Sequence, residues 1–253
     1  MLAFVTIGGG SPSLTPCGGV YRGRAATLSL PHALLFPDLP LRARRAQRKR
    51  RETELALLWE LCSGLRLALP EKRLMAAGWH PGSLGLVLPD RRQLLLTLAP
   101  RLALLALGER DVSLAAVHTD GRMSRAAAAV IAALCSRVRA VAVLPELPGG
   151  PVCACYGAAD LCSADSAELH VLLGPPADGF SPRPDAVVFS LCGDFPCLPP
   201  GSYIDAAQAP PEEYLLRSYD ATWLAAALAE CGMLRPEQVR IDRLIPKKTG
   251  TKY

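Results

Sequence analysis

Residues 112–146, VSLAAVHTDGRMSRAAAAVIAALCSRVRAVAVLPE, constrain the fold of this chain more than any other stretch. The run Leu114–His118 has no alternation of polar and apolar residues, which is typical of a strand covered on both faces. The following segment places Val130, Ile131 and Leu134 on one helical stripe, and AVAVL then supplies a second buried strand. A strand, a helix and a strand in such close succession predict a parallel, right-handed crossover and therefore an α/β fold.

Two further apolar runs, Leu169–Leu173 and Ala186–Leu191, predict strands that extend the same sheet. Near the end of the chain, prolines and glutamates precede an apolar stripe and Gly232 follows it, which predicts a helix over Pro211–Cys231. We therefore expect residues 109–253 to form one domain, a mostly parallel sheet with flanking helices that includes this C-terminal helix.

The first 108 residues show two different patterns. Residues 1–40 are rich in Gly and Pro and keep no regular period, which predicts a short strand at Leu2–Ile7 followed by a mostly irregular arm. From Glu52, apolar residues recur every three or four positions and predict a helix that Pro70 ends. A smaller α/β unit over residues 41–108 is completed by a helix near 71–77, a strand at Leu84–Leu88 and a helix over Arg91–Leu107.

Composition narrows the class of protein. The chain has 253 residues and is 50% hydrophobic, which is enough for a substantial core. Nine cysteines and a first segment unlike a secretory signal predict a reducing, cytoplasmic setting. The most apolar region is broken by Pro100 and Arg101, so we expect no membrane span.

The net charge of +5 comes from one local run. The rest of the chain holds 21 basic and 23 acidic residues, whereas the run contains no acidic residue and seven basic ones: Arg42, Arg44, Arg45, Arg48, Lys49, Arg50 and Arg51. Such a run can bind the phosphates of a nucleic acid. It contains no aromatic residue for base stacking, however, and this favours a solvated basic helix end over a nucleic-acid reader.

Other reactive residues do not form a motif. The cysteines between residues 153 and 197 lack the two close CxxC pairs of a structural zinc site, so we predict buried thiols and no metal. Lys72, Cys62 and His80 lie in the smaller unit, but their surroundings match no catalytic pattern, and Cys62 falls on the apolar helix face. We assign no catalytic residue.

Residues 112–191 resemble the core of a Rossmann-like NAD(P)-binding domain. In that family the ligand lies across the carboxyl ends of the strands, with its phosphates at the first helix and its ribose on an acidic residue after the second strand. The resemblance implies NAD or NADP as the cofactor and a crevice lined by Asp120, Gly121, Arg122, Ser124, Glu146, Gly174 and Gly193. The first turn, HTDGRMS, departs from the family because it has one glycine where the fingerprint has three.

Three functions therefore remain open. The chain binds a nucleotide, a dinucleotide or a related small anion at the strand ends, with no reaction assigned. Alternatively, it is a non-catalytic regulatory or scaffold protein that uses the fold as an interaction surface, because a fold alone does not carry function. The third hypothesis is nucleic-acid binding through residues 42–51.

Overall fold

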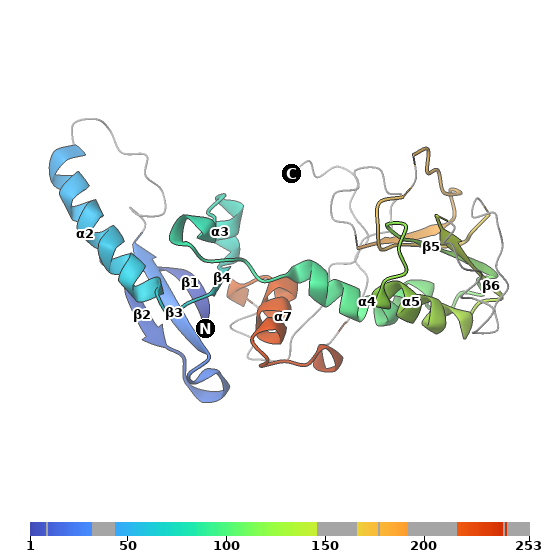
Figure 1. Ribbon diagram of the computed structural model, residues 1–253, viewed down its shortest axis with the longest axis horizontal. Helices are drawn as coiled ribbons and strands as arrows, with labels where there is room; N and C mark the ends of the chain where they lie inside the picture. The colour runs from blue at the N-terminus through green and yellow to red at the C-terminus, as the bar shows by residue number, and fades with distance from the viewer. Residues whose placement is uncertain are drawn as a thin grey trace. The chain divides into compact units, whose positions relative to one another are not determined.

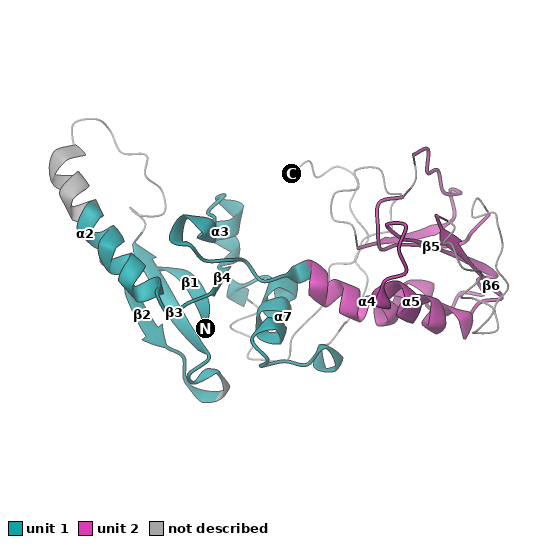
Figure 2. Cartoon of the chain, viewed as in Figure 1, with its two compact units in different colours: residues 1–91, 208–240 teal, residues 92–207, 241–253 magenta. Residues whose placement is uncertain are grey.

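The computed structural model describes residues 1–8, 10–31, 44–145, 166–176, 178–191, 217–239 and 241. The chain has two compact units, shown in different colours in Figure 2: residues 1–91 with 208–240 form unit 1, and residues 92–207 with 241–253 form unit 2. These bounds differ from the three-part division expected from the sequence. The structure is mixed α/β with mostly parallel sheets, and the predicted fold class is confirmed.

Unit 1 is built on a four-stranded sheet with the order β2-β3-β1-β4. Its strands are β1 (Leu2–Gly8), β2 (Ser13–Pro16), β3 (Ala25–Pro31) and β4 (Leu67–Pro70). The central strand β1 pairs in parallel with β3 and β4, while β2 is an antiparallel edge. The unit also contains α2 (Arg44–Cys62), α3 (Lys72–Ala76), α7 (Ala221–Glu230) and the 3-10 helices η1 (Gly19–Tyr21), η3 (Pro81–Leu84) and η5 (Pro236–Gln238) (Figure 1).

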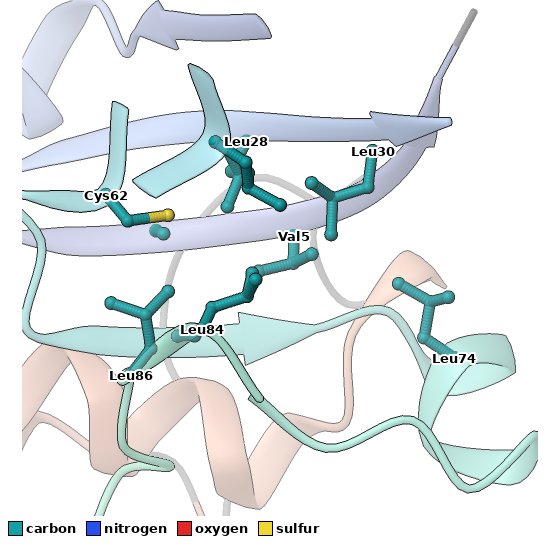
Figure 3. Close-up of a cluster of buried hydrophobic side chains, with 10 residues drawn as sticks. Val5, Leu28, Leu30, Cys62, Leu74, Leu84 and Leu86 are labelled. Carbon is teal, nitrogen blue, oxygen red and sulfur yellow. The ribbon is translucent and has the colours of Figure 1, made fainter. Parts of the chain in front are cut away.

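Both faces of this sheet are covered. On one face, apolar side chains of the strands pack with others from α2, α3 and the segment around η3, as Figure 3 shows; the buried cluster is Ala3, Val5, Leu28, Leu30, Leu58, Cys62, Ala68, Leu74, Leu84 and Leu86. On the other face, the Phe4 ring lies 5.9 Å from that of Tyr21 and 5.3 Å from that of Tyr219 between centroids. Burial on both faces explains why β1 and β4 are almost entirely apolar.

The prediction of a mostly irregular arm over residues 1–40 is wrong, although its short strand at Leu2–Ile7 is confirmed within β1. The chain forms β2 and β3 as well. The run from Ala26 to Leu30 in β3 does alternate apolar and polar residues, a strand pattern that this prediction missed. Pro12 and Pro16, which indicated a loop, lie beside and in the edge strand β2, where a missing backbone N–H costs no interior pairing. Residues 32–40 lie outside the described part of the chain.

Two predicted elements of residues 41–108 are also corrected. The helix ends at Cys62 instead of reaching Pro70, because the Ser63–Gly64 turn stops it and Leu67–Pro70 pairs with β1 as a strand. The strand expected at Leu84–Leu88 is reduced to one isolated bridge, from Val87 to Leu67. The other two helices are confirmed as α3 and α4 (Arg91–Leu107), and Gly108, with φ of +60°, ends α4.

The predicted C-terminal helix is interrupted at Tyr219 and Asp220, and its last part, α7, belongs to unit 1. Asp220 caps α7 with a side-chain oxygen that accepts from the backbone N–H of Thr222 and of Trp223, both at 3.0 Å, so the helix starts at Ala221. Residues 211–216 of the predicted helix lie outside the described part. The helix packs on β4, which corrects its expected place in the 109–253 domain.

Unit 2 contains the predicted parallel sheet. Its strands are β5 (Leu114–His118), β6 (Ala140–Leu144), β7 (Leu169–Leu172) and β8 (Val187–Ser190), in the order β6-β5-β7-β8 and all parallel. Helix α5 (Arg125–Cys135) joins β5 to β6 and packs on both. All four predicted strands are confirmed. Among the described residues, no helix combines the length and apolarity needed to cross a membrane.

Candidate functional site

The candidate site starts where β5 ends. Beyond His118, the backbone N–H of Thr119 donates to the Leu144 carbonyl of β6 at 2.6 Å, which continues the strand pairing by one residue. The Thr119 hydroxyl oxygen then accepts from the N–H of Gly121 at 3.2 Å, and Gly121 has φ of +81°, a conformation that other residues rarely adopt. The single glycine of HTDGRMS is therefore needed for this turn to close.

Ser124 connects the turn to α5. Its hydroxyl oxygen accepts from the backbone N–H of Ala127 at 3.1 Å, the usual N-cap bond, and its own N–H donates to the Arg122 carbonyl. The positive end of the helix dipole and its unpaired first N–H groups therefore face the carboxyl edge of the sheet. Asp120, Gly121, Arg122 and Ser124 are all exposed at this edge.

Gly174 completes the described part of the site from the neighbouring strand. Its N–H and that of Leu173 both donate to the His118 carbonyl, at 3.2 and 2.9 Å. A Cβ atom on Gly174 would lie 2.6 Å from the carbonyl carbon of Thr119 and 2.7 Å from the backbone nitrogen of Asp120. The two backbones therefore approach closely enough that no side chain fits between them.

The structure thus brings together five of the seven predicted site residues: Asp120, Gly121, Arg122, Ser124 and Gly174. Glu146 and Gly193 lie outside the described residues. Among the residues that are described, no group of three or more His, Cys, Asp or Glu side chains is placed to hold a metal ion.

A buried histidine pair beside this edge was not predicted. His118 and His170 are 3% and 2% exposed, and Nε2 of His118 lies 3.1 Å from Nδ1 of His170. The ring of Phe180 meets both edge-on, at 4.9 and 5.1 Å between centroids. Burial first, and the neighbouring imidazole second, lower the pKa of His118 from 6.5 to about 4, so the His118 ring is neutral at neutral pH.

Unit 1 carries a second polar group that the sequence did not indicate. Glu71, directly after β4, is 8% exposed, and its carboxylate accepts from the Thr6 hydroxyl at 2.6 Å and from Nε of Arg73 at 2.5 Å. The hydrogen bond from Arg73 raises the pKa of that guanidinium further. Because the N–H of Glu71 also donates to the Val5 carbonyl, this group ties the carboxyl ends of β1 and β4 together.

One of the reactive residues considered in the smaller unit is placed in the core. Cys62 lies in the buried cluster, and burial raises the pKa of its thiol, which agrees with the predicted core role. The basic run enters α2, which begins at Arg44, as the sequence suggested; Arg42 lies outside the described residues.

No protein-family model, curated protein or solved structure matches this chain.

Proposed function

We propose that unit 2 binds a nucleotide or a related small anion at the carboxyl edge of its sheet, on the turn from Asp120 to Ser124. The observation that carries this proposal is the strand order. From β5 the chain goes first to β6 on one side and then to β7 on the other, so the direction of winding reverses at the carboxyl end of β5. In open α/β sheets, ligands bind at such a switch point.

The order of the described strands also favours one class of ligand. Counted from β5, it reads second, first, third, fourth, which is the flavodoxin-like order; in the dinucleotide-binding order the third strand lies beside the second. Together with the missing glycines of the HTDGRMS turn, this favours a mononucleotide or a phosphate-sized anion over NAD or NADP. The cap of α5 supports the same choice, because the start of a helix attracts an anion.

The chemistry expected of this site is binding and orientation. The first N–H groups of α5 and the exposed guanidinium of Arg122 can hold phosphate oxygens, while Asp120 can accept from a hydroxyl group. Among the described residues exposed at this edge, the groups able to act as acid, base or nucleophile are the Asp120 carboxylate and the Ser124 hydroxyl, and the hydroxyl is engaged in the cap of α5, so we propose no reaction.

The test is a melting-temperature titration with FMN, ATP, NAD, NADP, FAD and inorganic phosphate. A ligand that binds only the folded protein stabilises it, by about 2.7 kcal/mol at a concentration 100 times its Kd. We expect stabilisation by FMN, ATP or phosphate, and its loss in Arg122→Gln.

The matched control is Arg139→Gln. Arg139 is also exposed, but it precedes β6 and therefore lies at the amino edge of the same sheet. Stabilisation that survives Arg122→Gln, or that no compound produces, would reject the site. The second outcome would favour the scaffold hypothesis, which the close approach of Gly174 to Thr119 supports because it fills the gap between β5 and β7 with backbone.

A further inference from the structure

The sheet of unit 1 has a switch point of its own. From β1 the chain goes first to β2 and β3 on one side and then to β4 on the other, so the direction of winding reverses at the carboxyl end of β1. Ligands of open α/β sheets bind at such points. The carboxyl ends of β1 and β4 are therefore a second position at which this chain can hold a ligand, and they belong to a different unit from the turn after β5.

A row of polar side chains crosses the sheet at this end. The register pairs Thr6 with Ser29 on β3 and Ser29 with Ser13 on β2, and neighbours in register share one face of a sheet. The bond from the Thr6 hydroxyl to the Glu71 carboxylate, at 2.6 Å, extends the row to the residue after β4. We call Ser13, Ser29, Thr6 and Glu71 the polar row. Adjacent strands are about 4.8 Å apart, so the row spans roughly 10 Å from Ser29 to Glu71.

Gly8 keeps the space beside Ser29 clear. It follows Thr6 by two residues on β1, and a Cβ atom on it would lie 2.7 Å from Cβ and 3.1 Å from Oγ of Ser29. Gly8 does not have a positive φ, so space and not backbone conformation requires glycine here. The hydroxyls of Ser29 and Thr6 are half-buried and that of Ser13 is exposed, which leaves the row partly accessible to solvent.

Arg73 is held in place at the end of this row. Its Nε donates to Oε2 of Glu71, and Oε1 of the same carboxylate accepts from Thr6. The side chain of Glu71 is 10% exposed, whereas that of Arg73 is 66% exposed. A guanidinium group is planar, so a hydrogen bond at Nε also fixes the direction of its terminal N–H groups. A buried carboxylate thus orients an arginine that remains largely in solvent.

The charges around Arg73 favour an anion. Residues 71–73 contain one acidic and two basic side chains, a net charge of +1, and the basic Lys72 and Arg73 are exposed while Glu71 is buried. An approaching anion therefore meets the positive charges first. The guanidinium group matches the oxygens of a phosphate, and the hydroxyls of the row can both donate to and accept from hydroxyl groups of a ligand.

We propose that the carboxyl edge of the unit 1 sheet binds a phosphorylated polyhydroxy molecule of the sugar phosphate class, with its phosphate on Arg73 and its hydroxyl groups along the polar row. Phosphate is preferred to carboxylate because it carries more negative charge and three acceptor oxygens. Thr6 and Glu71 are positioning residues: the hydroxyl holds the carboxylate, and the carboxylate holds the guanidinium. This site does not depend on the proposed function of unit 2.

The experiment is a urea titration followed by tryptophan fluorescence, which reports on unit 1 because all three tryptophans belong to it. The full chain carries Arg122→Gln, so that the site proposed in unit 2 does not contribute. The probes, at equal ionic strength, are ribose phosphate (the ester of the primary hydroxyl), inorganic phosphate, ribose and gluconate. A ligand that binds folded unit 1 raises its urea midpoint. We expect the largest rise with ribose phosphate, a smaller one with inorganic phosphate, and none with ribose.

Two arginine variants provide the matched comparison. Arg73→Gln should remove the rise and weaken ribose phosphate binding, measured by calorimetry, by about tenfold or more, because a charged hydrogen-bond donor is lost. Arg66 is also exposed but directly precedes β4, so it lies at the amino edge of the same sheet. Arg66→Gln should bind ribose phosphate like the Arg122→Gln parent. Both substitutions are at exposed side chains, so both variants should fold.

Glu71→Gln tests the positioning step through the sign of its effect. Removing a negative charge should strengthen anion binding if Glu71 only neutralises Arg73, whereas losing the bond to Nε should weaken binding if Glu71 orients the guanidinium. We expect weaker binding. In ¹H–¹⁵N NMR, the Nε–H signal of Arg73, identified by its absence in Arg73→Gln, should move towards that of a solvated arginine in Glu71→Gln.

Four outcomes would overturn the proposal. They are a urea midpoint that no phosphate compound changes, equal binding by the Arg73→Gln and Arg66→Gln variants, tighter binding of gluconate than of ribose phosphate, and tighter binding in Glu71→Gln. The first three do not require Glu71→Gln to fold. A failure of unit 2 to bind any anion leaves these results unaffected, because they are read from unit 1 with Arg122 already replaced.

Discussion

Replacing Gly174 with alanine tests the closest backbone approach in the candidate site. The added Cβ atom would lie 2.6 to 2.8 Å from the Thr119 carbonyl carbon and oxygen and from the Asp120 nitrogen, all of them backbone atoms. Overpacking of this kind typically costs about 1–3 kcal/mol, and the reduced freedom of the unfolded chain returns about 0.4–1 kcal/mol. We therefore expect Gly174→Ala to lower the free energy of unfolding of unit 2 by roughly 1–2 kcal/mol.

The part of unit 2 that Gly174→Ala destabilises can be identified, in addition to the size of the change in free energy. The clash must separate Gly174 from the turn, so exchange of the Leu173 and Gly174 amides should accelerate before that of β6. All three tryptophans, Trp59, Trp79 and Trp223, belong to unit 1, so their fluorescence in a urea titration follows unit 1 and serves as an internal reference.

Substitutions at two further glycines serve as controls, because they separate a steric clash from backbone strain and from neither effect. A Cβ on Gly64 meets no atom within 4 Å, and Gly64 does not have a positive φ, so Gly64→Ala should change stability little. At Gly121 the nearest atom is 3.8 Å away but φ is +81°, so Gly121→Ala carries backbone strain of about 1–2 kcal/mol instead of a clash. If Gly174→Ala is as well tolerated as Gly64→Ala, the close approach of the two backbones, and with it the geometry of the site, is refuted.

Three other perturbations have expected outcomes. Asp220→Ala removes both capping bonds at the start of α7 and should lower the free energy of unfolding by about 1 kcal/mol, measured by tryptophan fluorescence in urea. Asp220→Asn keeps the acceptor oxygen and should lower it less, and equal losses in the two variants would contradict the cap. Burial lowers the pKa of His118 from 6.5 to about 4, so the unfolded state binds the proton more readily than the folded state. The free energy of unfolding should therefore be constant above pH 6.5 and fall by roughly 3 kcal/mol in total as the pH drops to about 4. The measurement is the difference between the urea midpoints of the natural sequence and of His118→Gln. The double substitution Arg44→Glu and Arg45→Glu places anions in the first turn of α2, which contains no acidic residue, and should raise the melting temperature through the helix dipole. If the same variant is retained on heparin as strongly as the natural sequence, the nucleic-acid hypothesis is rejected.

Local patterns predicted unit 2 well because its elements are separated by clear stops. The four strands are apolar runs, and α4 has the predicted bounds because Gly108 adopts a positive φ directly after it. The turn after β5 was also predictable, since its glycine and its Ser124 cap act within a few residues.

Unit 1 was predicted less well because pairing between distant segments decides its structure. Leu65 and Leu69 continue the helical spacing of α2, yet Leu67–Pro70 is a strand because β1 offers it a parallel partner. The helix at the far end of the sequence likewise packs on this sheet, and no local signal indicates which of the two sheets it covers.

The histidine pair and the Thr6–Glu71 bond were missed for a related reason. The histidine pair joins two strands across 52 positions of the sequence, and the Thr6–Glu71 bond joins β1 to the residue directly after β4 across 65 positions. Both become visible only once strand order and register are known. The one sequence signal was a polar residue in an otherwise apolar strand, His118 at the end of β5 and Thr6 two residues before the end of β1. Such residues are candidates for contacts across neighbouring strand ends even when no motif surrounds them.

These contacts also restrict where a ligand of unit 2 can lie. Between β5 and β7 the edge is filled by the backbone of Gly174 against Thr119, with the buried pair of His118 and His170 beside it. The exposed groups lie on the outer side of the turn, from Asp120 to the start of α5. An anion bound here must therefore sit over the helix N-terminus instead of between the strands, and Arg122, on that side of the turn, is the side chain whose loss should weaken binding most.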